Sequence, residues 1–180
     1  MSSRLPDFVD PWRLANLGKQ LSGAVGLGEL SRLAEALVSV EGESLFTLEF
    51  YRDEKKRARI KGNVEAELVL ECQRCLEPVT LPVDAEVNLA VIEVAAEAEL
   101  LPDECDPVMV EEGRIQLLDL IEDELLLAIP QVPMHPQGTC PVEMETLFTN
   151  GDFEDLQQES ATDEANPFAV LAGLKPDKQN

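Results

Sequence analysis

The chain has 180 residues, which is enough for one compact domain with an appendage but crowded for two full domains. Hydrophobic residues make up 44% of the chain but aromatic residues only 4%, so aliphatic side chains must supply most of the core. The formal net charge of -22 disfavours binding to a nucleic-acid backbone, because such binding depends on phosphate neutralisation by Lys and Arg. A basic protein partner fits this charge better.

The amino-terminal sequence "MSSRLPDFVDPWRLANLG" lacks the continuous apolar stretch of a secretory signal. No run approaches the roughly 18 apolar residues that span a bilayer. We therefore expect a cytoplasmic protein that does not contact a membrane. In a reducing compartment, disulfides explain four cysteines poorly, which favours metal ligands, catalysis or inert thiols.

The first predicted elements are a helix and a strand. Within residues 29–40, Leu30, Leu33 and Leu37 follow the spacing of an amphipathic helix. From Phe46 to Phe50 apolar and polar residues alternate, as in a half-buried strand, and the polar "RDEKK" that follows predicts a turn.

A long hairpin is predicted over residues 62–92. Two rows of alternating apolar residues, 64–72 and 79–91, are joined by "CQRCLEP", which places Cys72 and Cys75 at the hairpin tip. Pro82 indicates that the returning strand begins at a sheet edge or a bulge, because proline lacks the amide hydrogen of a ladder bond.

The next predicted elements are a loop, two short strands and a second helix. Residues 95–107 are acidic and contain two prolines, so we expect an exposed loop that includes Cys105. Short strands are predicted at 108–110 and 114–117, with a turn at Gly113. A helix is predicted from Leu118 to about Ile129, with an apolar stripe and a wet side that includes Glu122.

These elements predict an α+β domain over residues 1–145, in which an antiparallel sheet with a long central hairpin packs against two helices, near 29–40 and 117–129. Residues 146–164 are predicted to be an acidic flexible linker. Residues 165–180 are predicted to form a short helical or linear segment. Its apolar side chains either fold back onto the domain or dock on a partner: Phe168, Val170, Leu171 and Leu174.

Four residues form a candidate metal site. Cys72 and Cys75, together with His135 and Cys140, supply the donors of a tetrahedral Cys3His zinc centre. Four protein ligands leave no open position, so one structural zinc ion is expected rather than a catalytic one. The alternative is that Cys72 is a core residue, Cys75 a loop thiol and His135 an ordinary surface residue. A redox pair fits less well, because a strand rather than a helix follows the second cysteine.

The stretch "RDEKKRARIK", residues 52–61, holds six basic residues. Arg57, Arg59 and Lys61 would line one face of a strand and could contact RNA phosphates. A solvated turn and a charged edge strand explain the same residues, and we favour this reading. Phosphate-binding glycine loops and nucleophile elbows are absent from the sequence, so we expect neither an enzyme nor a small-molecule substrate.

Four segments carry a family resemblance, and they stand in order: "LVSVEGE", "LECQRCLEPV", "LLDLIEDELLLAIPQVPMH" and "NPFAVLAGLK". Together they resemble the YceD-type family, the bacterial large ribosomal RNA subunit accumulation proteins. The resemblance implies a non-enzymatic role in the synthesis, processing or stability of 23S ribosomal RNA, and so in large-subunit biogenesis.

Many members of that family carry a second Cys-x-x-Cys after the helix, whereas this chain offers only His135 and Cys140 there and resembles the proteobacterial branch. Its acidity implies action through a basic ribosomal protein or a large-subunit assembly factor, with only indirect association with rRNA. The rival hypotheses are a direct RNA-binding module that uses residues 52–61 and, third, a thiol redox protein.

Overall fold

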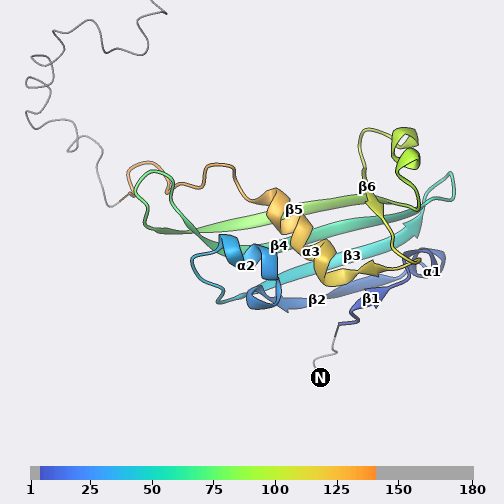
Figure 1. The fold of residues 1–180 in the computed structure, drawn as a ribbon, viewed down its shortest axis with the longest axis horizontal. Coiled ribbons are helices and arrows are strands. Elements are labelled where there is room, and N and C mark those ends of the chain that lie inside the picture. Colours follow the sequence, from blue (N-terminus) through green and yellow to red (C-terminus); the bar gives the residue numbers. More distant parts are fainter. Residues whose placement is uncertain (1–4, 141–180) are drawn as a thin grey trace, which may run out of the picture. The chain divides into compact units, whose positions relative to one another are not determined.

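The computed structural model describes residues 5–140. A five-stranded sheet has the order β2-β3-β4-β5-β6, and β1 pairs with β7 in a separate two-stranded sheet (Figure 1). The predicted linker 146–164 and segment 165–180, with Phe168, Val170, Leu171 and Leu174, lie outside the described residues. The elements are β1 (Phe8–Val9), α1 (Pro11–Leu17), β2 (Gln20–Gly26), η1 (Leu27–Glu29), α2 (Ser31–Ala36), β3 (Glu43–Arg52), β4 (Ala58–Glu71), β5 (Pro78–Ile92), η2 (Ala95–Leu100), β6 (Asp106–Met109), β7 (Ile115–Gln116) and α3 (Leu117–Ala128).

The hairpin of β4 and β5 is the longest feature of the sheet, as predicted. Its antiparallel register runs from Glu71 opposite Pro78 to Arg59 opposite Ala90, so β4 begins at Ala58, before the predicted start. β6 bonds to β5 only from Leu89 to Ile92. Pro82 therefore lies on a free edge, where its missing amide hydrogen removes no ladder bond.

One face of the sheet is covered by helices and forms the core (Figure 1). α3 packs on β4 and β5, α1 packs on β3 and β4, and α2 contacts α3. The largest fully buried side chains are almost all aliphatic, with Phe50 as the aromatic exception. The α+β fold with an antiparallel-dominated sheet is thus confirmed, and its core is aliphatic as the composition required.

The first predicted helix is shorter than its periodicity indicated. α2 ends at Ala36, and Leu37 is already extended. The Val38 amide donates to the Val69 carbonyl at 2.8 Å, so the chain here pairs with β4 instead of continuing the helix. The prediction of a helix through residue 40 is wrong. The valine-containing segment 37–40 pairs with β4, and local periodicity cannot reveal such a tertiary contact.

Glu122 was expected on the wet side of the second helix, and that expectation is wrong. Its side chain is buried and accepts hydrogen bonds from the Arg32 amide at 2.6 Å and the Leu33 amide at 3.0 Å. The Arg32 Nε also donates to it at 2.8 Å. Because α2 has no side-chain cap of its own, this carboxylate of α3 caps the first turn of α2.

The amino-terminal elements α1 and β2 were not predicted. α1 is only seven residues long, too short for its periodicity to be clear. The signals at its ends were nevertheless present: Asp10 accepts from the Arg13 amide at 2.9 Å, Pro11 opens the helix, and Gly18 ends it with a φ of 57°. No helix within residues 5–140 is long and apolar enough to cross a membrane.

The segment after the hairpin differs from prediction in two respects. The chain does turn at Gly113, but β6 joins β5 in parallel and β7 pairs with β1. Cys105 was expected to be exposed in the loop. It is buried instead, and its thiol donates to the Pro102 carbonyl at 3.5 Å. The reason is that the loop folds back to enter β6, which places the residue before that strand against the sheet.

Candidate metal centre at the hairpin tip

The tip of the hairpin brings its two cysteines back toward each other. The Cys72 amide donates to the Glu77 carbonyl at 3.0 Å, and the Leu76 amide donates to the Cys72 carbonyl at 2.8 Å. Leu76 has a φ of 63°, the left-handed conformation that closes such a turn. The tight turn leaves both thiols on the side from which a second segment can approach.

The second segment is the chain that follows α3, which lies beside the tip (Figure 1). The Gln73 amide donates to the Pro133 carbonyl at 2.8 Å and holds this segment against the turn. A further turn follows, in which the Thr139 amide donates to the Pro136 carbonyl at 3.1 Å. That turn returns Cys140 toward His135. Cys75 and His135 are separated by 59 residues in the sequence, yet their side chains lie close together.

The four predicted metal ligands meet in one cluster. All their ligand atoms lie within 4.8 Å of one another. The Sγ atoms of Cys72 and Cys140 are 3.8 Å apart, and His135 Nδ1 lies 3.4 Å from Cys75 Sγ and 3.7 Å from Cys140 Sγ. Around a tetrahedral zinc, two sulfurs would be about 3.8 Å apart, and a sulfur and a nitrogen about 3.6 Å. These three distances therefore match those expected between the ligands of a zinc ion.

The imidazole is oriented for this role. His135 Nε2 lies 3.1 Å from the Pro78 carbonyl, which can only accept a hydrogen bond. Nε2 therefore carries the proton in the neutral ring and donates to Pro78, and the lone pair of Nδ1 faces the thiols. A backbone acceptor that fixes the tautomer of a ligating histidine is the usual outer-shell arrangement of a zinc centre.

The thiols differ in their electrostatic environment. Burial opposes ionisation of Cys72, but hydrogen bonds from the backbone amides of His135, Cys75 and Arg74 outweigh it and lower its pKa to about 5. Burial raises the pKa of Cys75, and the neighbouring Cys140 and Cys72 add to that effect. The protein by itself thus favours the thiolate of Cys72, whereas it opposes ionisation of Cys75.

Arg74 supports the cluster and was not singled out from the sequence. Its Nε donates to Cys140 Sγ at 2.9 Å, and its Nη2 donates to the His135 carbonyl at 3.2 Å. The signal that could have identified it is its place inside Cys-Gln-Arg-Cys, where a cation can offset the net negative charge of three thiolates around a divalent ion.

The basic residues of 52–61 are placed differently. Arg57 precedes β4 and binds Asp53 at 2.7 Å, and Lys61 lies 3.3 Å from Glu49 and 5.1 Å from the centroid of the Tyr51 ring. Arg59 is buried. Its Nε donates to the Leu89 carbonyl at 3.2 Å and its Nη2 to the Asn88 side chain at 2.7 Å.

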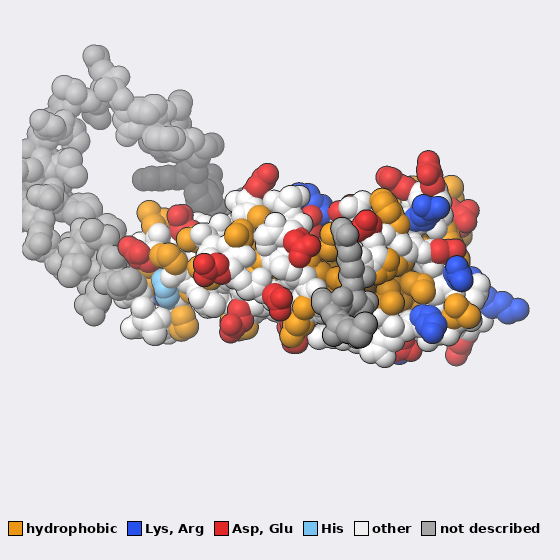
Figure 2. Space-filling view, turned by 90° about the horizontal axis from the view of Figure 1, so that it is seen from below, with side chains coloured by type: hydrophobic (Ala, Val, Ile, Leu, Met, Phe, Trp, Pro, Cys, Tyr) orange, Lys and Arg blue, Asp and Glu red, His pale blue; other side chains and the backbone are white. Residues whose placement is uncertain are grey.

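The three cations thus each have protein partners instead of forming one exposed row. In Figure 2 acidic side chains are spread along the visible face, and basic ones gather toward the end where the β3–β4 turn lies.

Comparisons with known proteins are consistent with the sequence motifs. Residues 60–175 match the family model "Large ribosomal RNA subunit accumulation protein YceD". A protein of that name from Haemophilus influenzae is 38% identical over 173 residues, covering 96% of this chain and 97% of the relative. No solved structure matches. The chain therefore belongs to the YceD family of large ribosomal RNA subunit accumulation proteins.

Proposed function

We propose that this protein is a non-enzymatic factor in the synthesis, processing or stability of 23S ribosomal RNA during large-subunit biogenesis in the cytoplasm. The observation that carries the proposal is the similarity to a large ribosomal RNA subunit accumulation protein over nearly the whole length of both chains. A match of that extent includes the core, the hairpin tip and the segment after α3.

The charge of the protein indicates how it acts. A net charge of -22 repels phosphate, and the three basic side chains that could have contacted RNA bind acidic or carbonyl groups of the protein itself. We infer that it acts through a basic ribosomal protein or a large-subunit assembly factor, whose Lys and Arg side chains suit an acidic surface.

The proposed function is tested by deleting the gene in its host and comparing the amounts of 23S and 16S rRNA. We expect the ratio of 23S to 16S rRNA to fall and to recover when the gene is returned on a plasmid. An unchanged ratio in the deletion strain would contradict the proposal.

The mode of action is tested by titrating the purified protein against isolated 23S rRNA and against basic large-subunit proteins at several salt concentrations. Tight RNA binding that weakens steeply with salt would favour the direct RNA-binding alternative. We expect measurable affinity only for a basic protein.

We further propose that the cluster of Cys72, Cys75, His135 and Cys140 holds one structural zinc ion. The distances, the tautomer of His135 and the soft donor set support it, and four protein ligands leave no position for a substrate. The ion would join the hairpin tip to the segment after α3. Protein purified without chelator should contain about one equivalent of zinc, and metal-free protein of equal stability would refute the proposal.

A further inference from the structure

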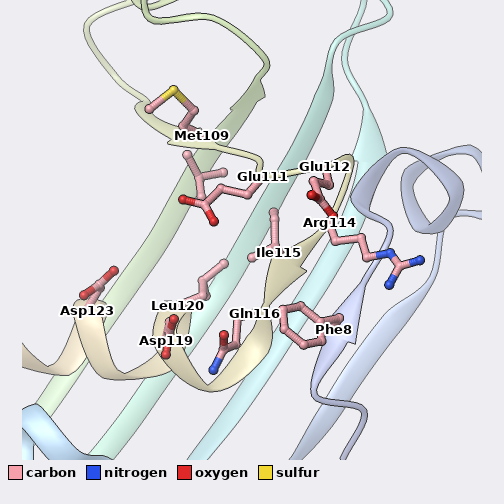
Figure 3. A pocket seen from close by; sticks show the side chains of 11 residues that line it. Phe8, Met109, Glu111, Glu112, Arg114, Ile115, Gln116, Asp119, Leu120 and Asp123 are labelled. Carbon is pink, nitrogen blue, oxygen red and sulfur yellow. The ribbon is translucent and has the colours of Figure 1, made fainter.

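A groove lies between β6, β7, β1 and the first turns of α3, at a distance along the sheet from the thiol cluster. Its volume is about 620 Å³. Figure 3 shows the side chains that line it, which come from these four elements and from the turn before β7. Neither the family comparison nor the metal centre accounts for this surface.

The floor of the groove is apolar. Ile115 and Leu120 are buried at its base, and Val108 is half-buried. Two large apolar side chains flank it in a more exposed state: Phe8 is 56% exposed and Met109 is 59% exposed. Exposed large apolar residues that share one concave surface mark a binding site more often than isolated ones do.

The rim of the groove is acidic on two sides. Glu111 and Glu112 come from the turn before β7, and Asp119 and Asp123 come from α3 (Figure 3). Asp123 is paired with Arg32 at 2.6 Å. Within residues 5–140 the other three acids form no ion pair, and Arg114 is the one basic residue of the lining.

The turn that presents two of these acids is held in a defined conformation. Glu111 and Arg114 exchange backbone hydrogen bonds of 3.2 and 2.9 Å across it. Both central residues are left-handed, with φ of 51° at Glu112 and 77° at Gly113, as in a type I′ turn. A glutamate in this conformation costs free energy relative to Asn or Gly, so the hydrogen bonds of the turn hold Glu112 in place against that cost.

Asp106 and Glu124, which are not part of the lining, add negative charge beside Asp123. Burial raises the pKa of Glu124 on α3, and the carboxylates of Asp106 and Asp123 raise it further. The charges of Asp106 and Asp123 therefore repel the ionised form of Glu124. A cationic ligand would relieve that repulsion, whereas a phosphate or a second copy of this acidic chain would increase it.

We propose that this groove binds a basic peptide segment of the partner protein, with an aliphatic or aromatic side chain on the Ile115–Leu120 floor and Lys or Arg side chains against the acidic rim. Such a peptide complements both the apolar floor and the acidic rim, whereas neither RNA nor a membrane complements both. The proposal rests on the proposed function and identifies the surface that its basic partner would contact.

The first test uses the full chain and a fluorescein-labelled synthetic peptide of alternating Lys and Leu, followed by fluorescence anisotropy. The double variant Glu111→Lys/Glu112→Lys should weaken binding at least about tenfold, because it reverses two rim charges. The matched control is Glu65→Lys/Asp84→Lys, which makes the same charge change at exposed positions of β4 and β5.

The control pair should bind within about twofold of the unmodified protein, and thermal melts should show that both pairs are folded. Equal weakening by the two pairs would mean diffuse attraction and would overturn the proposal.

The second test addresses the apolar floor. Met109→Ser should weaken binding of the same peptide several-fold, whereas Leu100→Ser, at a residue that is 76% exposed outside the groove, should not. A peptide with Ser in place of Leu should lose most of its affinity for the unmodified protein. Equal affinity of the Lys-Leu and Lys-Ser peptides would contradict binding of an apolar side chain on the groove floor.

The last test separates this proposal from the proposed function. The Glu111→Lys/Glu112→Lys variant should fail to restore the 23S to 16S rRNA ratio in a deletion strain that the unmodified gene does restore. Full restoration by a variant that has lost peptide binding would overturn the groove proposal alone. An unchanged ratio in the deletion strain itself would contradict the proposed function and leave the peptide affinities to decide the groove.

Discussion

The hairpin tip and the basic stretch 52–61 lie at opposite ends of β4. The fold brings the candidate ligands of the tip together but keeps the basic side chains of 52–61 apart. At the tip, four soft donors from two distant segments face one another within 4.8 Å. In the basic stretch, side chains that are close in sequence have different environments: Arg59 is buried, whereas Lys61 is exposed.

The comparison shows that proximity in sequence is a poor guide to a shared site. Alternate residues of a strand share a face, but what covers that face varies along the strand. Arg59 is buried because Asn88 and the Leu89 carbonyl supply partners, whereas Lys61, two residues on, is exposed and pairs with the exposed Glu49. The cluster at the tip is held together by backbone hydrogen bonds between its two segments, and it is therefore the better candidate for a site.

The largest effect on stability is expected from removing one of the candidate metal ligands at the hairpin tip. If the proposed zinc ion joins the two segments, Cys72→Ser should reduce bound zinc from about one equivalent to nearly none and lower Tm by on the order of 10 °C or more. Zinc content and calorimetry measure both. Cys105→Ser is the matched control, a buried cysteine outside the cluster, and it should keep its zinc. Loss of zinc in both variants would contradict the assignment of ligands.

The second-largest effect is a difference in stability loss between substitutions of Arg59 and Lys61 on β4. Arg59→Ala should lower the free energy of unfolding by about 2–4 kcal/mol, because it leaves the Asn88 side chain and the Leu89 carbonyl without their donor. Lys61→Ala should change it by less than about 0.5 kcal/mol, since its ion pair is exposed. Denaturant unfolding measures both, and equal effects would refute the difference in role.

A smaller effect is expected from the cation beside the thiols. Arg74→Met removes the donor to Cys140 and should weaken zinc affinity by about 10- to 100-fold without abolishing binding. Competition with a chromophoric chelator measures this affinity. Gln73→Met, at the exposed neighbouring position, should leave it unchanged. If both variants bind zinc like the unmodified protein, Arg74 has no role in the centre.

The smallest effect concerns Asp53, which holds Arg57. Burial raises the pKa of Asp53, but hydrogen bonds from Arg57 outweigh it, so the pKa lies below its ordinary value of 3.8. The pair therefore stabilises the fold above that ordinary value, and the contribution is lost as pH falls through the lowered pKa. Asp53→Asn should cost about 1 kcal/mol at pH 7.

The pH dependence of that cost is the sharper measurement. Unfolding curves of Asp53→Asn and the unmodified protein should converge as the pH falls below the lowered pKa of Asp53, where the carboxylate is protonated in both the folded and the unfolded state. Glu49→Gln, the corresponding change at the exposed partner of Lys61, should have almost no effect at either pH. A constant difference for Asp53→Asn across this range would contradict an ionic role.

Much of the fold followed from the sequence. The alternation over residues 64–72 and 79–91 required a hairpin, because strand residues two apart share a face and these had to be buried together. The α3 helix ended where Pro130 predicted. α1 and β2 were missed because short elements carry little periodicity, and α2 was predicted too long because its last residues pair with β4.

The sequence by itself determined the hairpin, the acidic character and the presence of two donors at each of two separate places. Only the tertiary structure decided that Cys72, Cys75, His135 and Cys140 meet, that Glu122 is buried beneath α2, and that an acidic rim surrounds an apolar groove. The physical reason is that local patterns follow from the period of one helix or strand. Contacts between segments follow from which surfaces the whole chain must bury and which backbone groups it must pair.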